Sequence, residues 1–257
     1  MSLLEFQRLR MCPDITIKEG ALFIADAHDS AERSSFLTFL EHLQLNPPPQ
    51  LFLMGDMFDL LVGGIANTER KYALYINAIN ALSNQCEIIY FEGNHDFNLT
   101  QLFLHVKIIP ISQQPICGVF EDGKRCLLSH GDRYAKGLEA LYTAWIRHPL
   151  TLKILGGFDI VLKGAISNAI MRDQCRKNLC RKIPHFEALI ASKIDRYPTK
   201  GVDMIVEGHY HQNQFFTCKN ISYVNFPSFA CNQSYFSVQS SQETKFVSIH
   251  CTSCPKK

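Results

Sequence analysis

Five times along this 257-residue chain, an apolar run ends in a tight cluster of aspartate, histidine or asparagine residues. The clearest case is the apolar run at 88–91, which leads into the sequence Gly-Asn-His-Asp at 93–96. Short apolar runs bounded by glycine and polar residues are typical of buried strands. In open α/β sheets, binding sites gather at the carboxyl ends of the strands. The repeated pattern therefore predicts one site built from several strand ends.

The other four clusters combine carboxylates and imidazoles, which are ligands for divalent transition metals. They follow apolar runs at 21–25, 51–54, 125–129 and 202–206. A hydrophobic core gains nothing from converging histidines and aspartates, so five such clusters predict a metal site. Their residues are Asp26 and His28, Asp56 and Asp59, His130 and Asp132, and His209 and His211.

Helical periodicity separates the first three predicted strands. Apolar residues recur at helical spacing over 35–45, and a second helix is expected over about 68–82. Strands that alternate with helices indicate βαβ units and a mainly parallel sheet, an α/β fold. The chain after the last cluster is expected to form antiparallel strands of a second sheet, near 214–217, 222–225, 235–238 and 245–249.

Residues 133–200 are too many for a plain loop in a compact domain, and they show helical patterning. We expect a helical cap here, inserted into a catalytic domain made of residues 1–132 and 201–257. The cap carries a net charge of +8, although the whole chain carries only +2. A solvated helical surface would explain this excess. A basic amphipathic insertion over a metal site also suits an anionic, partly apolar substrate at a membrane surface.

Composition is that of an ordinary globular protein, with 46% apolar and 19% charged residues. Neither a secretory signal nor a run of 18 apolar residues is found, so no export and no membrane span are expected. The ten cysteines have no regular spacing, so free cytoplasmic thiols are expected instead of disulfides. Cys251 and Cys254 have CxxC spacing, but a zinc site would need a second pair, and Cys175 with Cys180 is only a loose candidate.

Taken together, the clusters resemble the calcineurin-like metallophosphoesterases, whose pattern is D-x-H, G-D-x-x-D, G-N-H-[DE], a later His and G-H-x-H. This resemblance implies a four-layer α/β/β/α sandwich around two divalent metal ions. Mixed nitrogen and oxygen ligands favour Mn²⁺, with Fe or Zn²⁺ as alternatives. Position by position, the pattern assigns one ion to Asp26, His28 and His211, the other to Asn94, His130 and His209, and the bridge between them to Asp56.

The same resemblance implies roles for the residues around the metals. Two ions clamp a phosphoryl group and activate a water molecule for in-line attack. His95 is not a ligand in this pattern, and it would stabilise the phosphoryl oxygens or protonate the leaving oxygen. Asp59, Asp96 and Asp132 would orient the ligands, while turn and cap roles stay open for Asp59 and Asp96.

Within that family, a helical insertion directly after Asp132 resembles the UDP-2,3-diacylglucosamine hydrolases of lipid A biosynthesis. That likeness implies an anionic nucleotide-sugar lipid as substrate and peripheral contact with the cytoplasmic face of the inner membrane. No nucleic acid is expected as a partner, because the basic cap has no evident stripe of aromatic residues for base stacking. No obligate protein partner is expected either.

Two positions depart from that subfamily, which commonly has Arg and Thr where this chain has His95 and Tyr210. Two alternatives therefore stay open. One is a metal-dependent phosphodiesterase or phosphatase that acts on a soluble nucleotide or a phosphoprotein. The other is a non-catalytic scaffold, although scaffolds of this fold are expected to lose ligands and here every ligand position is filled.

Overall fold

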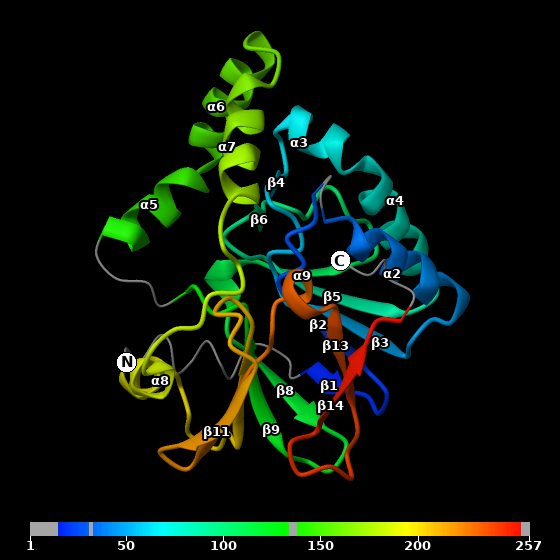
Figure 1. Cartoon of the computed structure of the whole chain (residues 1–257), viewed down its shortest axis with the longest axis vertical. Helices are drawn as coiled ribbons and strands as arrows, with labels where there is room; N and C mark the ends of the chain where they lie inside the picture. Colours follow the sequence, from blue (N-terminus) through cyan, green and yellow to red (C-terminus); the bar gives the residue numbers. More distant parts are fainter. Residues whose placement is uncertain (1–14, 31–32, 134–137, 253–257) are drawn as a thin grey trace.

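In the computed structural model, which describes residues 15–30, 33–133 and 138–252, two six-stranded sheets stack on one another (Figure 1). The first sheet has four parallel strands and two antiparallel strands at one edge. Its order is β14 (Phe246–His250), β13 (Ser234–Val238), β2 (Leu22–Ile24), β3 (Gln50–Leu53), β5 (Glu87–Phe91) and β7 (Lys107–Ile109).

The second sheet is mixed, with β9, β10 and β12 parallel to one another. Its order is β1 (Ile15–Ile17), β8 (Ile116–Phe120), β9 (Arg125–Ser129), β10 (Met204–Glu207), β12 (Ile221–Asn225) and β11 (Gln214–Cys218). A third, two-stranded sheet pairs β4 (Leu61–Val62) with β6 (Asp96–Phe97), and it joins the loops that follow β3 and β5.

The predicted strands are present, but the prediction that all four late strands form the second sheet was wrong. Strands β13 and β14 extend the first sheet, while β11 and β12 belong to the second. The short helix α9 (Phe229–Asn232) carries the chain from β12 to β13, which pairs with β2 of the first sheet. Period-two patterning identifies a strand but holds no information about its partner.

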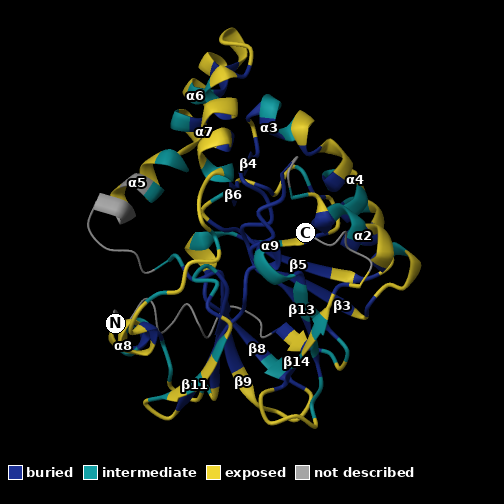
Figure 2. Cartoon of the chain, viewed as in Figure 1, coloured by how far each residue is buried: buried dark blue, intermediate teal, exposed yellow. Residues whose placement is uncertain are grey.

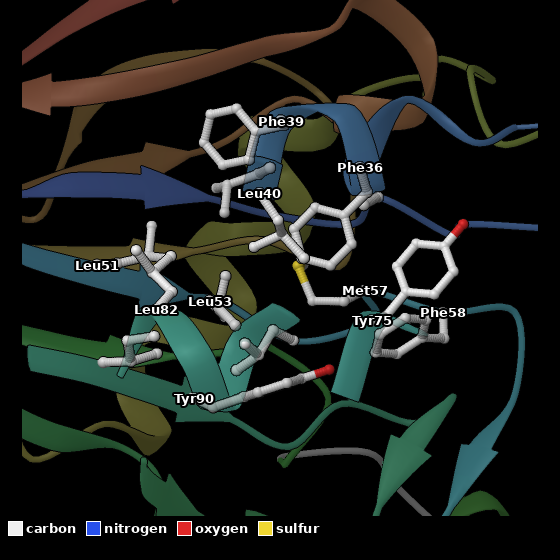
Figure 3. Packing of buried hydrophobic residues seen from close by; sticks show 14 of the residues in the cluster. Phe36, Phe39, Leu40, Leu51, Leu53, Met57, Phe58, Tyr75, Leu82 and Tyr90 are labelled. Atoms are coloured by element: carbon white, nitrogen blue, oxygen red, sulfur yellow. The ribbon is translucent and has the colours of Figure 1, made fainter. Parts of the chain in front are cut away.

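Strands of the first sheet are apolar on both faces, because both faces are covered. Phe23, Phe52 and Ile89 pack against the second sheet in a shared core. The opposite face packs under α2 (Ser35–Leu45) and α4 (Ala73–Leu82), where Phe36, Leu53 and Leu82 belong to one core cluster (Figure 3). Full burial of such a side chain contributes roughly 1.5–3 kcal/mol. These contacts fix the strand ends that carry the predicted ligands.

The outer face of the second sheet is covered by α8 (Phe186–Lys193). Phe186 and Ile190 of this helix pack on Leu127, Ile205 and Tyr223. The layers therefore run helices, sheet, sheet, helix, which confirms the predicted α/β/β/α sandwich.

Three helices of the predicted cap project beyond the sandwich: α5 (Leu138–Ile146), α6 (Pro149–Val161) and α7 (Ala165–Cys175) (Figure 1). They are largely exposed (Figure 2), and α6 contacts α3 (Ala66–Lys71) of the sandwich. The predicted cap, residues 133–200, also includes α8, which lies on the second sheet and does not project. The predicted domain boundaries therefore stay a prediction. In the described ranges no single helix is long and apolar enough to cross a membrane; α6 and α7 together are, but they bend by 101° at their junction.

The single helix expected over 68–82 is instead two helices, α3 and α4, which meet at Tyr72. The Tyr72 hydroxyl donates a hydrogen bond to the carbonyl oxygen of Asp29 at 3.0 Å. Neither proline nor glycine lies at this break, so the sequence pattern gave no sign of it.

Candidate metal centre

The loops that follow β2, β3, β5, β9 and β10 meet at one edge of the sandwich, near α5–α7. Three groups of metal-type donors gather there, and within each group the donor atoms lie within 4.8 Å of one another. Asp56 and His28 each belong to two groups, so the groups form one continuous cluster. The groups are Asp26, His28 and His211; His28, Asp56 and His95; and Asp56, His130 and His209.

The first predicted ion site lies between the ends of β2 and β10. His211 Nε2 is 3.2 Å from Asp26 Oδ1, and the His28 and His211 rings lie 5.3 Å apart between centroids. His211 Nδ1 donates to the carbonyl oxygen of Leu179 at 2.7 Å. Because a carbonyl only accepts, Nδ1 carries a proton, and Nε2 is the nitrogen that would face a metal.

The second predicted ion site repeats this arrangement. His130 Nδ1 donates to the carbonyl oxygen of Met54 at 2.9 Å, so Nε2 is the nitrogen that faces the cluster. That Nε2 lies 3.3 Å from Asp56 Oδ2 and 3.4 Å from Asn94 Oδ1. The His209 ring lies 5.0 Å from the His130 ring. The structure thus brings all seven predicted ligands together, and their ligand roles stay a prediction.

The donor set fits divalent cations. Asp26 Oδ1 and both ring nitrogens of His28 are buried and have no hydrogen-bond partner among the described residues. Each such group costs about 1–3 kcal/mol unless a ligand satisfies it. Burial lowers the pKa of His28 well below its usual range and the pKa of His209 to about 4. Both rings are therefore neutral at neutral pH, which is the form that binds metals.

Asp56 is charged in the same conditions. Burial by itself would raise its pKa, but the imidazoles of His130 and His95 outweigh this and hold the pKa well below its ordinary value. A carboxylate with two oxygens in the middle of the cluster can contact both ions. This position agrees with the predicted bridging role.

Five of the seven predicted ligands have a left-handed backbone, which is rare for residues other than glycine. Such conformations cost on the order of 1–3 kcal/mol each and persist only where the surrounding structure enforces them. Hydrogen bonds do so here: the His28 amide donates to the carbonyl oxygen of Asp56 at 3.0 Å. The φ angles are 52° at Asp26, 41° at His28, 54° at Asp56, 61° at His209 and 59° at His211.

Two glycines of the motifs are required by close approach of the clusters. A Cβ atom at Gly93 would lie 2.2 Å from Asp56 Oδ1, and one at Gly208 would lie 2.6 Å from Asp26 Oδ2. Each distance is too short for any side chain. The glycine of one motif therefore makes room for the carboxylate of another.

Asp96 holds two of the loops together. Its carboxylate accepts hydrogen bonds from the amides of Asp56 (2.9 Å), Met57 (2.6 Å) and Gly93 (2.9 Å). The Tyr90 hydroxyl donates to the same carboxylate at 2.5 Å. Asp96 thus fixes the backbone on either side of Asp56, in line with the orienting role predicted for it.

Asp59 accepts two hydrogen bonds from Arg33 Nη2, at 2.6 and 2.7 Å, and its Oδ1 lies 3.9 Å from His28 Nδ1. Asp132 lies on the opposite side of the centre, where its Oδ2 is 3.7 Å from Arg147 Nη2. The sequence pattern singled out neither arginine, since both lie outside the motifs.

His95 has the geometry of a group that acts on the substrate. Its amide donates to Asp56 Oδ1 at 2.8 Å, and its Nδ1 donates to the carbonyl oxygen of Asp59 at 2.9 Å. Nε2 is therefore the nitrogen left for a proton transfer or a phosphoryl oxygen. Two divalent ions held by the predicted ligands would polarise a phosphoryl group and lower the pKa of a water molecule. The predicted role of His95, to stabilise or protonate an oxygen beside them, stays a prediction.

A cavity of about 530 Å³ opens onto this cluster. At its polar end lie Asn94, His95, Asp132, Arg147 and His209. Away from the cluster its walls come from the loop after β3, from β4, and from α6 and α7. The wall side chains are largely apolar and include Leu60, Val62, Ile65, Phe97, Leu152, Leu155, Ile166 and Ile170.

The expectation that the cysteines are free thiols was wrong for Cys180 and Cys231, which form a disulfide with Cα atoms 5.7 Å apart. Cys251 is also disulfide-bonded. The loose zinc pairing of Cys175 with Cys180 fails because Cys180 is already bonded. Cys254 lies outside the described residues. Spacing along the sequence gave no sign of the Cys180–Cys231 pair because 51 residues separate the two cysteines.

The sandwich and its cluster of seven metal-type ligands define a metal-dependent phosphoesterase. The family model for calcineurin-like phosphoesterases matches residues 21–213, and the chain belongs to that family. It is therefore a hydrolase of phosphoester bonds, as predicted.

Several curated relatives are named UDP-2,3-diacylglucosamine hydrolase. A UDP-2,3-diacylglucosamine hydrolase from Blochmanniella pennsylvanica is 26% identical over 204 residues, covering 74% of this chain and 78% of that protein. The hydrolase of the same name from Shewanella piezotolerans is 36% identical over 87 residues, covering 32% of this chain and 35% of that protein.

Solved structures with a similar fold include an E. coli phosphoesterase, Yfce, at 15% identity and a TM-score of 0.43, covering 89% of this chain and 97% of that one. An archaeal phosphodiesterase has the same TM-score at 13% identity, and the match covers 89% of this chain and 98% of that one.

Proposed function

We propose that this chain hydrolyses the pyrophosphate bond of UDP-2,3-diacylglucosamine in lipid A biosynthesis. One water molecule is consumed, and UMP and 2,3-diacylglucosamine 1-phosphate are released. The observation that carries the proposal is the cavity: it joins the predicted metal ligands to an apolar interior. A soluble phosphoester has no apolar group to bury in that interior. An acyl chain, in contrast, gains about 0.8 kcal/mol of binding free energy for each methylene that it buries.

The relatives support the lipid over other phosphoesters. The relative from Blochmanniella pennsylvanica, whose name states this activity, matches about three quarters of the chain. Under this proposal the sugar phosphate and the nucleotide phosphate lie at the polar end of the cavity. The acyl chains then lie along the apolar lining of the cavity, which includes Leu60, Leu155 and Ile170.

We further propose Mn²⁺ as the native metal, with Fe or Zn²⁺ as alternatives. Four imidazoles, carboxylates and one amide oxygen make up the predicted donor set. A mixed set of nitrogen and oxygen donors suits Mn²⁺, Fe and Zn²⁺ better than Mg²⁺ or Ca²⁺, which prefer oxygen donors alone.

Contact with the cytoplasmic face of the inner membrane is part of the same proposal, because the acylated substrate resides in a bilayer. The projecting helices expose apolar side chains that would otherwise face water. Lys153 and Lys163 lie among them, and cations near a bilayer surface are attracted to anionic lipid. The exposed apolar residues include Ile154, Phe158, Ile160, Val161 and Leu162.

The direct test is product identification. Purified protein with Mn²⁺ is incubated with UDP-2,3-diacylglucosamine in mixed micelles, and the products are separated by chromatography. The proposal predicts UMP and the diacylated sugar 1-phosphate in equal amounts. Release of UDP, or no turnover while a soluble phosphodiester is hydrolysed, contradicts it. The second of these results would favour the alternative, an enzyme for a soluble nucleotide, which the presence of His95 also suits.

A further inference from the structure

Arg147 lies in the cap, between α5 and α6, yet its side chain reaches the strand-end loops. Its Nη2 donates a hydrogen bond to the carbonyl oxygen of Gly93 at 2.5 Å, directly before Asn94. The guanidinium also lies 5.0 Å from the centre of the Phe97 ring. These contacts hold the arginine against the loop that carries Asn94 and His95.

The side chain of Arg147 is only 13% exposed, so its charge is largely removed from water. A buried cation of this kind needs an anionic partner. The nearest carboxylate is that of Asp132, but at 3.7 Å it is too distant for a hydrogen bond. The pair therefore balances charge without occupying the donors of the guanidinium.

Two donors of Arg147 are left over. Nε and Nη1 are both buried, and neither has a hydrogen-bond partner in the described part of the chain. Leaving them unsatisfied is unfavourable in the free protein. Arg147 lines the same cavity as Asn94, His95 and His209, where a phosphate group of the substrate must lie for hydrolysis at the metal centre.

We infer that Arg147 is a phosphate-binding residue, with Nε or Nη1 donating to an oxygen of the substrate's phosphate or pyrophosphate group. Together with the second N–H of Nη2, either nitrogen presents two parallel donors to two phosphate oxygens, which an ammonium group cannot do. The contact with Gly93 holds the guanidinium in place before the substrate binds. Binding therefore costs little side-chain entropy. The cap thereby contributes a cation to the reaction centre as well as walls to the cavity.

This inference rests on phosphoester hydrolysis at the metal centre, but it does not require the lipid substrate. It can therefore be tested with simple probes. The variants are Arg147→Ala, Arg147→Lys and Arg147→Met, the last of which keeps the packing on Phe97. Arg172→Ala is the matched control, since it removes an exposed arginine of α7. Each is assayed with Mn²⁺ on a p-nitrophenyl phosphodiester and for inhibition by tungstate, an oxyanion that imitates phosphate.

We expect kcat/KM to fall about 10- to 100-fold in the alanine and methionine variants, as for loss of a charge-assisted hydrogen bond. The tungstate inhibition constant should rise by a similar factor, with bound Mn²⁺ unchanged. Added ethylguanidinium should restore activity to Arg147→Ala. Lysine should recover only part of the loss, and Arg172→Ala should stay within twofold of wild type.

A purely structural role for Arg147 would give a different result. In that case the loss of activity would follow a loss of bound Mn²⁺ or of thermal stability, and ethylguanidinium would not restore it. That outcome, or kcat/KM within twofold of wild type in Arg147→Met, overturns the inference. Failure to hydrolyse the nucleotide-sugar lipid would leave these readouts unaffected, so the two proposals fail independently.

Discussion

The amide of His209 donates a hydrogen bond to the carboxylate of Asp26 at 2.9 Å, although 183 residues separate them. The bond uses Asp26 Oδ2, while Oδ1 lies 3.2 Å from His211 Nε2. One oxygen therefore joins the end of β2 in the first sheet to the loop after β10 in the second. The other stays available for a metal, so the geometry of the centre depends on how the two sheets stack.

Asp56→Asn should abolish most of the activity, because it removes the negative charge that two donor groups share. We expect kcat/KM on a p-nitrophenyl phosphodiester with Mn²⁺ to fall at least about 100-fold. Metal analysis should show fewer than two ions bound per chain. Asp173→Asn, at an exposed position of α7, is the control and should behave as wild type. Full metal content with a rate within tenfold of wild type would argue against the bridging role.

His95→Gln should affect substrates according to their leaving group. If His95 protonates the leaving oxygen, the variant should hydrolyse an alkyl phosphodiester with a kcat/KM about 100-fold or more below that of wild type. The p-nitrophenolate leaving group needs no such proton, so kcat/KM for a p-nitrophenyl substrate should fall much less. His95→Arg should resemble His95→Gln on the alkyl substrate, because arginine does not give up its proton at neutral pH. Equal losses on both substrates would instead indicate stabilisation of the phosphoryl oxygens.

Lys193→Met should strongly destabilise the fold. Lys193 Nζ donates to Glu207 Oε2 at 2.8 Å and to the carbonyl oxygen of Gly131 at 2.7 Å. Burial works against its charged form, but Glu207 outweighs burial and raises the pKa of the ammonium group. Removal of one partner from a buried pair costs about 3–5 kcal/mol.

The control for that prediction is Lys219→Met, which breaks an exposed pair with Asp195. Exposed pairs contribute about 0–1 kcal/mol. Urea unfolding at pH 7 should therefore separate the two variants by several kcal/mol. Similar unfolding free energies would show that the buried Lys193–Glu207 pair stabilises the fold no more than a surface pair does.

The Cys180–Cys231 disulfide joins the segment after α7 to α9, closing a loop between residues 51 apart in sequence. Its loss, in the double variant Cys180→Ala/Cys231→Ala, should lower the unfolding free energy by about 4 kcal/mol on chain-entropy grounds. A reductant should shift the urea midpoint of wild type and shift that of the double variant much less. Identical midpoints for both proteins without reductant would contradict a stabilising bond.

Local patterns in the sequence predicted what depends on local chemistry. The periodicity over 35–45 corresponds to α2, and the run at 125–129 corresponds to β9. The motifs also predicted which side chains would meet at the strand ends. These features follow from burial and from the glycines and polar residues that terminate strands.

Long-range pairing could not be predicted in the same way. Nothing in the residues of β13 and β14 indicates that they pair beside β2, and nothing in the spacing of Cys180 and Cys231 indicates a bond. Arg147 was missed for a related reason. Its contact with Gly93 joins residues 54 apart in the sequence, which no local pattern reveals.

The most direct test of the proposed function is the ratio of kcat/KM for UDP-2,3-diacylglucosamine to that for the same nucleotide sugar without acyl chains. Leu155 lines the cavity, while its neighbour Ile154 points outward and is 50% exposed. We predict that this ratio is large for the wild-type protein. Leu155→Glu should lower the ratio sharply, because kcat/KM falls for the lipid substrate and stays unchanged for the non-acylated one. Ile154→Glu should keep the wild-type ratio when the lipid is supplied in micelles. Equal turnover of the acylated and non-acylated substrates by the wild-type protein would contradict the account.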